Sequence, residues 1–200
     1  MAEHDRVAKT RRPYRLRARA AAMDRTHQRI IRAAVELHGT IGPAATTMSG
    51  VAARAGVTRA TLYRHFANDE ALFAACTADW LAANPRPDPA RWATIADPAR
   101  RLGLALDELY AYYRSTEQMR ANVLRDIAVF PANIRSGLAA FPSAAVEALE
   151  TGWPGRSDAH LRRAAIGHAV GFETWRSLAR EGLTDKEAAA LMVRLVTSIG

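Results

Sequence analysis

A short segment from Thr58 to Phe66 places basic, hydroxyl and small side chains on what reads as a single helix. Leu62 and Phe66 are four residues apart, so they share one face, which we expect to pack against a core. The side chains left free on the other faces are of the types that bind base edges and phosphates: Arg59, Ala60, Thr61, Arg64 and His65. The segment therefore predicts a helix that enters the major groove of DNA.

Several of these side chains have two interpretations. Arg59 could bind a guanine edge through two hydrogen bonds, or it could contact phosphate alone or solvent. Ala60 and Thr61 offer methyl groups to thymine, or they are small only to permit close approach. Tyr63 is predicted to donate to a phosphate, because Leu62 and Phe66 already fill the buried face.

The preceding residues would position this helix. A first helix is expected to start at Thr47, whose hydroxyl can cap free backbone N–H groups, and to bury Val51 and Ala55. Gly56 would end that helix, because the turn needs a positive φ that glycine adopts without steric cost. Thr58 can cap the second helix. These features together predict a helix-turn-helix.

Positive charge is concentrated in the first third of the chain. The 200 residues carry a net charge of +8, with 13 Lys or Arg against 4 Asp or Glu up to residue 66 and 15 against 16 afterwards. This asymmetry favours one nucleic-acid face joined to a separate, neutral part. Residues 1–23 are predicted to form a basic mobile arm, which either follows DNA phosphates and a minor groove or is a solvated tail. The DNA-binding domain is then expected over residues 24–70.

The remainder, residues 71–200, keeps a helical spacing of apolar residues with no convincing alternating strand. The sequence therefore predicts an all-α protein of about nine helices, with an N-terminal three-helix domain and a larger helical second domain. One of the expected helices is long, from about Asp158 to Arg180, and another begins with a capping box at Thr184 and Glu187.

Several functional classes lack their signatures. We find no phosphate-cradling glycine loop, no nucleophile motif around Ser49 and no metal-binding pattern among the six histidines, so we expect no catalytic residues, no metal and no cofactor. Cys76 is the single cysteine and is predicted to pack as a small apolar residue rather than to act as a redox sensor. No stretch is apolar enough to span a membrane, so no membrane partner is expected and the cytoplasm is the expected location.

The chain resembles the TetR/AcrR family of one-component transcriptional regulators. Three stretches carry the resemblance: IIRAAVELHGTIG from Ile30, TTMSGVAARAGVTRATLYRHF from Thr46, and NDEALF from Asn68. It implies a three-helix DNA-binding domain, a larger helical domain that binds a small-molecule effector, and a homodimer whose two reading helices meet a palindromic site on double-stranded DNA.

By position, the resemblance implies phosphate contacts from Thr47, Thr58 and Tyr63. It implies groove contacts from Arg59, Ala60 and Thr61, and flanking contacts from Arg64 and His65. The chain departs from the family pattern in two places. Asp69 stands where a lysine that touches phosphate is common, and there it would cap a helix but repel DNA. His38 stands where an aromatic is common and is predicted to be a core histidine rather than a pH switch.

Aromatic and apolar residues of the second domain are expected either to line an effector pocket or to form an ordinary core. The pocket set comprises Tyr110, Tyr113, Met119, Phe130, Phe141, His168, Phe172 and Trp175. Their character suggests a largely apolar or aromatic effector.

The helix expected over residues 158–180 is apolar on almost all sides, so it must be covered on two sides. With the last helix, it is predicted to form half of a four-helix dimer interface; the alternative is burial inside one subunit. The interface set comprises Ile166, Gly167, Val170, Gly171, Leu178, Leu191 and Leu195.

Together, these expectations predict a dimeric repressor that a small molecule releases from its operator. Two alternatives stay open: a sequence-tolerant architectural DNA-binding protein without an effector, and a helical protein-interaction module.

Overall fold

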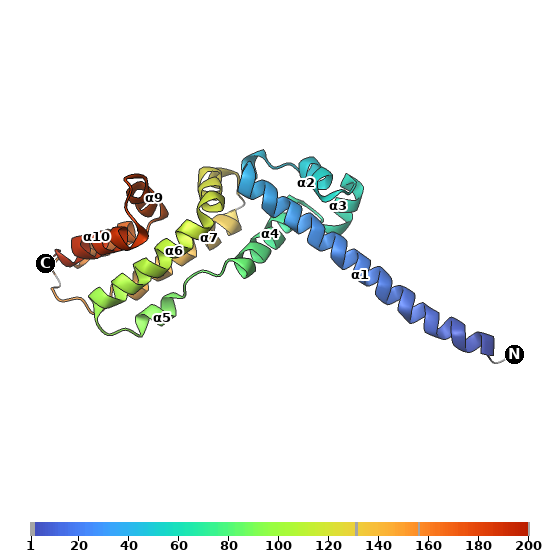
Figure 1. Cartoon of the computed structure of the whole chain (residues 1–200), viewed down its shortest axis with the longest axis horizontal. Helices are drawn as coiled ribbons and strands as arrows, with labels where there is room; N and C mark the ends of the chain where they lie inside the picture. The colour runs from blue at the N-terminus through green and yellow to red at the C-terminus, as the bar shows by residue number, and fades with distance from the viewer. Residues whose placement is uncertain (1–2, 131, 156, 200) are drawn as a thin grey trace. The chain divides into compact units, whose positions relative to one another are not determined.

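A computed structural model describes residues 3–130, 132–155 and 157–199, and its chain divides into two compact units, 1–83 and 84–200. Within the described ranges every regular element is a helix, which confirms the predicted all-α class (Figure 1). The first unit contains α1 (Glu3–Thr40), the 3-10 helix η1 (Pro43–Ala45), α2 (Met48–Ala55), α3 (Arg59–His65) and α4 (Asp69–Ala83). The second contains α5 (Pro89–Ala93), α6 (Pro98–Arg125), the 3-10 helix η2 (Ile127–Val129), α7 (Ala132–Leu149), α8 (Ala159–Ala169), α9 (Phe172–Arg180) and α10 (Asp185–Thr197).

Helix α1 starts much earlier than expected. The sequence predicted a mobile arm over residues 1–23 and a domain from residue 24, but the backbone is helical from Glu3, so the predicted arm continues the same helix. Alanines between the arginines explain this, because alanine and arginine are both good helix formers even without an apolar stripe. The side chains of the arm that precede residue 17 lie outside the described residues, so their predicted phosphate contacts stay a prediction.

The core of the first unit brings α1, α2, α3 and α4 together. Its buried side chains are Ile30, Ile31, Ala33, Ala34, Met48, Val51, Ala52, Ala55, Leu62, Phe66, Leu72 and Cys76. The Cys76 thiol donates weakly to the carbonyl oxygen of Ile31 at 3.8 Å, and burial raises its pKa to about 12. A thiol that stays protonated at neutral pH is a poor nucleophile, so Cys76 is an apolar core residue, as predicted.

His38 lies against Phe73 of α4, with ring centroids 5.3 Å apart, and burial lowers its pKa from 6.5 to about 4. Between those pH values the folded protein binds fewer protons than the unfolded chain, so stability falls as the pH drops below 6.5. We expect the free energy of unfolding to lose about 2 kcal/mol by about pH 4.5 relative to neutral pH. Urea unfolding of the whole chain at both pH values measures this loss.

The matched control is His38→Phe, which keeps an aromatic ring in the same place but removes the titrating group. The His38-dependent part of the acid sensitivity should disappear in this variant. Equal acid sensitivity in both proteins would contradict the assignment and move the effect to other groups.

In the second unit, α6 supplies much of the buried surface. Asp97 caps α6, since its carboxylate accepts from the backbone N–H groups of Ala99 and Arg100, and Pro98 occupies the first turn. The buried residues of α6 include Leu102, Ala105, Leu106, Leu109, Tyr110 and Tyr113. They share one core with side chains from α5, α7, α8, α9 and α10. This core is separate from that of the first unit.

The helix expected over residues 158–180 is two helices, because the chain breaks between α8 and α9 at Gly171. A Cβ atom at Gly171 would lie 3.0 Å from the carbonyl oxygen of His168 and 3.3 Å from Oγ1 of Thr174, so a larger residue would push these neighbours away by a few tenths of an ångström. Two buried tyrosines of α6 hydrogen-bond to carbonyls at the break: the Tyr110 hydroxyl donates to Ala169 at 2.8 Å and the Tyr113 hydroxyl to Val170 at 2.7 Å. Periodicity alone could not reveal this break, because both halves keep a helical spacing.

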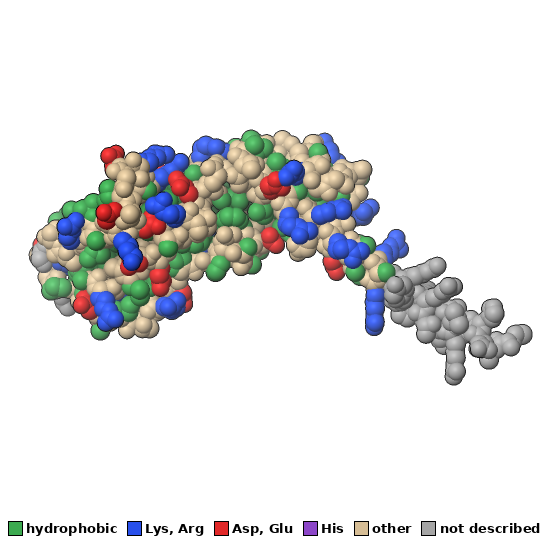
Figure 2. Space-filling view, in the orientation of Figure 1, with side chains coloured by type: hydrophobic (Ala, Val, Ile, Leu, Met, Phe, Trp, Pro, Cys, Tyr) green, Lys and Arg blue, Asp and Glu red, His purple; other side chains and the backbone are tan. Residues whose placement is uncertain are grey.

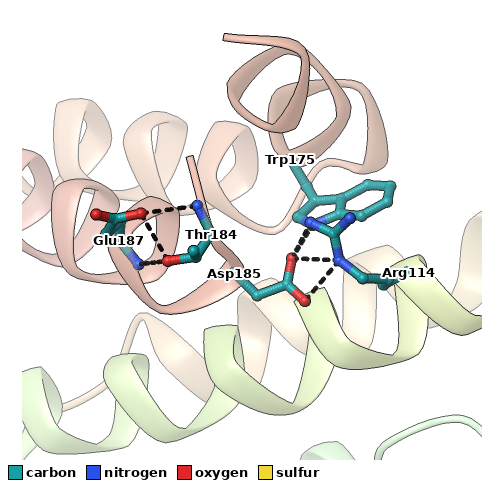
Figure 3. Close-up of polar contacts among 5 residues, drawn as sticks. All are labelled: Arg114, Trp175, Thr184, Asp185 and Glu187. Carbon is teal, nitrogen blue, oxygen red and sulfur yellow. Dashed lines mark hydrogen bonds and ion pairs between the residues drawn. The ribbon is translucent and has the colours of Figure 1, made fainter. Parts of the chain in front are cut away.

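Polar contacts join α6, α9 and α10 around the start of α10 (Figure 3). The Asp185 carboxylate accepts from Nη2 of Arg114 at 2.7 Å and from Nε1 of Trp175 at 2.8 Å. The hydrogen bond from Arg114 is the main cause that lowers the pKa of Asp185. Beside it, Thr184 and Glu187 form the predicted capping box. These bonds set where α10 meets α6 and α9.

No helix in the described part of the chain has the length and apolar character that crossing a membrane requires.

Candidate nucleic-acid interface and ligand domain

The helix-turn-helix forms as the residue types predict. The Thr47 side chain accepts from the backbone N–H of Gly50 at 3.0 Å and starts α2. Gly56 ends α2 in the left-handed conformation, with φ of 64°, and the N–H of Val57 then donates to the carbonyl of Ala52 at 2.9 Å. Thr58 caps α3 by accepting from the N–H of Thr61 at 3.1 Å. The turn therefore has a defined geometry that places the start of α3 on the surface.

Helix α3 has one buried side and one exposed side. Leu62 is completely buried, and Phe66, which follows the helix, is 4% exposed, so the predicted back face is confirmed. The exposed side presents Arg59, Ala60, Tyr63 and Arg64 to solvent, and Thr61 and His65 are half-buried at its edges. This arrangement leaves the proposed reading side chains free to contact a ligand.

Side chains at the start of α3 are arranged by their neighbours. The guanidinium of Arg59 lies 5.8 Å from the ring centroid of Tyr63, one turn along the helix. The Thr58 hydroxyl donates to the Thr61 hydroxyl at 3.0 Å, which leaves the proton of Thr61 available to another acceptor. Stacking restricts the arginine, so less freedom is lost when its planar group meets a base edge or a phosphate.

Contacts from α1 hold the helix pair in place, and the sequence reasoning did not identify them. The ring of His27 stacks on Phe66, with centroids 4.5 Å apart, and lies 5.9 Å from the ring of His65. Burial, then the charges of His27 and Arg64, lower the pKa of His65. Arg54 of α2 forms an ion pair with Glu36 of α1. The signal for His27 was its spacing three residues before the buried Ile30.

The prediction that Asp69 caps α4 is wrong. The side chain of Asn68 caps this helix by accepting from the N–H of Ala71 at 2.8 Å, and Asp69 is the first helical residue with an exposed side chain. A carboxylate there is favourable at the helix N-terminus but would repel a DNA phosphate.

The described part of α1 adds positive charge to the first unit. Its exposed arginines are Arg17, Arg19, Arg25, Arg29 and Arg32. Figure 2 shows basic side chains gathered over this end of the unit. Such a surface attracts a polyanion over distances comparable to the screening length of the salt.

In the second unit, half of the predicted pocket set forms one buried aromatic cluster. The Tyr113 ring meets Phe172 edge-on at 5.5 Å, and Phe172 lies 5.6 Å from Trp175. The ring of Tyr110 lies 6.3 Å from that of Tyr113. The polar atoms of both tyrosines bond to backbone carbonyls, so these residues support the core as well as bounding any cavity.

The remaining pocket candidates lie elsewhere or at the margin. Phe141 is half-buried and packs against the same core. Met119 and Phe130 are buried, but neither belongs to that apolar core. His168 is exposed, and its Nδ1 lies 3.4 Å from the hydroxyl of Thr174, so it is not among the buried side chains of the aromatic cluster.

Some residues of the predicted interface set are buried within the chain, and others are partly or largely exposed. Ile166 and Val170 are 0% and 4% exposed within a single chain, so they have no surface left for a partner, which corrects their assignment to the interface. Gly171 forms the break between α8 and α9, and Gly167 faces Val146 of the same chain. Leu178 and Leu191 pack partly on the core, whereas Leu195 is 51% exposed. Leu161 of α8 is also exposed, and the sequence reasoning did not select it for the interface.

Two arginines of the second unit were also missed. Arg120 of α6 stacks over Tyr113, with its guanidinium carbon 4.7 Å from the ring centroid, and Arg86 lies over Phe141 at 5.3 Å. The signal for Arg120 was its position seven residues after Tyr113, which places both on one face of a helix.

The capped helix pair and its exposed basic face define the first unit as a DNA-binding helix-turn-helix domain. Residues 30–76 match the family model described as bacterial regulatory proteins, tetR family. The resemblance to TetR regulators is thereby confirmed for residues 30–76, which contain the helix-turn-helix. No curated protein sequence matches the chain.

Solved structures of regulators share the fold over both units. A TetR-like regulator from Rhodococcus sp. RHA1 is 21% identical, with 86% of this chain and 93% of that chain covered and a TM-score of 0.57. NalD, the secondary repressor of the MexAB-OprM multidrug efflux pump in Pseudomonas aeruginosa, is 20% identical, with coverage of 88% and 96% and a TM-score of 0.56. FadR from Bacillus subtilis, in complex with stearoyl-CoA, is 19% identical, with coverage of 84% and 96% and a TM-score of 0.57.

Proposed function

We propose that this protein is a sequence-specific transcriptional regulator, a repressor that a small, largely apolar ligand releases from a palindromic operator. The exposed side of α3 carries the proposal, because it presents Arg59, Tyr63 and Arg64 on a helix whose back is buried and whose start is capped. A rigid, basic helix with free hydrogen-bond donors meets the requirements for reading a major groove.

The operator would be read by a homodimer. Leu161 of α8 and Leu195 of α10 expose apolar side chains, and α8 packs against α10, so these helices offer a surface that a second copy could cover. Two reading helices related by a two-fold axis would then meet two half-sites of opposite orientation.

The ligand would bind in the second unit. The aromatic cluster of Tyr113, Phe172 and Trp175 supports an apolar contact surface there. The structure of Bacillus subtilis FadR with stearoyl-CoA supports the idea that this fold accommodates a small molecule. A ligand that prefers the non-binding arrangement by about 1–3 kcal/mol would weaken operator affinity about 5- to 150-fold.

Footprinting of the full chain on its own upstream and neighbouring intergenic DNA tests the proposal. We expect protection of a site with two-fold symmetry, whose half-sites lie about one helical turn, or a multiple of it, apart. A protected region without two-fold symmetry would contradict the dimeric reading mode.

The exposed arginines of α1 favour a second candidate function, a sequence-tolerant DNA-binding protein without an effector. It predicts a steep loss of affinity with added salt and almost equal affinity for operator and random DNA. A specificity ratio of at least about 1,000 at physiological salt would reject it. No mobility shift at low salt would instead favour the helical protein-interaction module.

A further inference from the structure

We propose that the effector of this protein is an organic acid, an apolar body with a carboxylate that Arg120 and Arg86 of the second unit bind. The role of this ligand as an effector rests on the proposed function, whereas the binding site is inferred from the side chains around Arg120 and Arg86.

Arg120 is held in an aromatic environment. Its guanidinium carbon lies 4.7 Å from the ring centroid of Tyr113, 5.3 Å from that of Phe172 and 5.7 Å from that of Tyr112. All three rings belong to residues that are less than 10% exposed. The Nε atom of Arg120 is buried and has no hydrogen-bond partner among the residues that the structure describes. Aromatic rings stack on the flat faces of a guanidinium group. They provide no acceptors for its N–H groups, which point outward in the plane of the guanidinium.

Arg86 approaches the same core from the segment before α5. It lies over the ring of Phe141, which packs on the core that contains Tyr113 and Phe172. Its Nε atom is likewise buried, without a hydrogen-bond partner in the described part of the chain. Burial raises the pKa of the Tyr113 hydroxyl to about 12, while the charges of Arg120 and, more weakly, Arg86 act in the opposite direction. Both cations therefore lie close enough to Tyr113 to affect its ionisation.

No acid among the described residues compensates either cation. The neighbouring Arg176 also stacks on Phe172, but it has carboxylates nearby: its Nε lies 3.7 Å from Glu117 and its Nη1 lies 3.8 Å from Glu173. Arg120 and Arg86 form no ion pair and no side-chain hydrogen bond with the described residues. Partly buried cations without counter-charge are unfavourable, and a bound anion would remove this cost.

The geometry selects the class of ligand. Guanidinium groups bind carboxylates through paired N–H donors, and the aromatic rings below them offer an apolar surface to the body of the ligand. An organic acid matches both features. An inorganic anion matches only the charge, and a neutral apolar molecule matches only the rings.

Thermal unfolding and calorimetric titration of the full chain test this assignment. The probes are benzoate, phenylacetate, octanoate and decanoate, with phenylacetamide, 1-octanol and inorganic phosphate as matched controls. We expect at least one carboxylate to raise Tm, with its uncharged analogue and phosphate binding at least about ten-fold more weakly. Arg120→Gln and Arg86→Gln should each weaken carboxylate binding about ten- to hundred-fold.

The matched variant is Arg180→Gln, which removes an exposed arginine of α9 and should leave carboxylate affinity unchanged. Two variants in different segments keep the test informative if one of them fails to fold. No stabilisation by any carboxylate, equal binding of the uncharged analogues, or unchanged affinity in both arginine variants would overturn the proposal and leave stacking as the role of these arginines. Carboxylate binding that leaves the operator footprint unchanged would keep the site and remove its role as effector site.

Discussion

Arg59→Ala is expected to lower the affinity of the dimer for its operator at least about 30-fold. Each arginine that binds a guanine through two hydrogen bonds contributes about 1–3 kcal/mol, and a dimer loses two such contacts. Arg59 is exposed, and its guanidinium stacks on Tyr63, so its removal should leave the fold intact. Titration of the symmetric footprint site, with random DNA as competitor, measures the loss.

The comparison with random DNA separates base contacts from phosphate contacts. If Arg59 reads a base, Arg59→Ala weakens operator binding far more than random binding, whereas Tyr63→Phe should weaken both by a similar few-fold factor. Arg180→Ala, at an exposed position of α9 in the second unit, is the matched control and should change neither affinity. An operator affinity that survives Arg59→Ala and Tyr63→Phe together would contradict the assignment of α3 as the reading helix.

Replacing both Tyr110 and Tyr113 by phenylalanine is expected to cost about 2–4 kcal/mol of the free energy of unfolding. Each hydroxyl donates to a buried carbonyl at the break between α8 and α9, and a buried carbonyl left without a donor costs about 1–3 kcal/mol. These carbonyls face no continuing helix, because Gly171 interrupts the ladder of backbone bonds. Chemical denaturation of the full chain measures the change.

Tyr112→Phe is the matched control for this pair. Tyr112 is adjacent in sequence and 8% exposed, but its hydroxyl forms no hydrogen bond with the described residues. Its loss should therefore change stability by less than about 0.5 kcal/mol. A double variant as stable as the Tyr112→Phe control would show that the two hydroxyls do not stabilise the break.

Many features of the first unit follow from short-range rules that can be applied to the residues one turn at a time. Thr47 and Thr58 cap their helices and Gly56 adopts a positive φ, all as their types and spacing predicted. Such signals involve atoms within about four residues of one another, so a short stretch of sequence includes both partners of each interaction. The same reasoning correctly identified the capping box at the start of α10.

Other features depend on residues far apart in the chain. The partners of Arg120 come from α6 and α9, and the break at Gly171 is stabilised by tyrosines about sixty residues earlier. The sequence analysis assigned Ile166 and Val170 to an interface because helical periodicity indicates that their face must be covered. Periodicity does not indicate whether the same chain or another chain covers that face. The helix-turn-helix could therefore be predicted from the sequence alone. The cation-rich aromatic cluster and the burial of α8 are determined by the tertiary structure, because burial and charge compensation depend on neighbours in space.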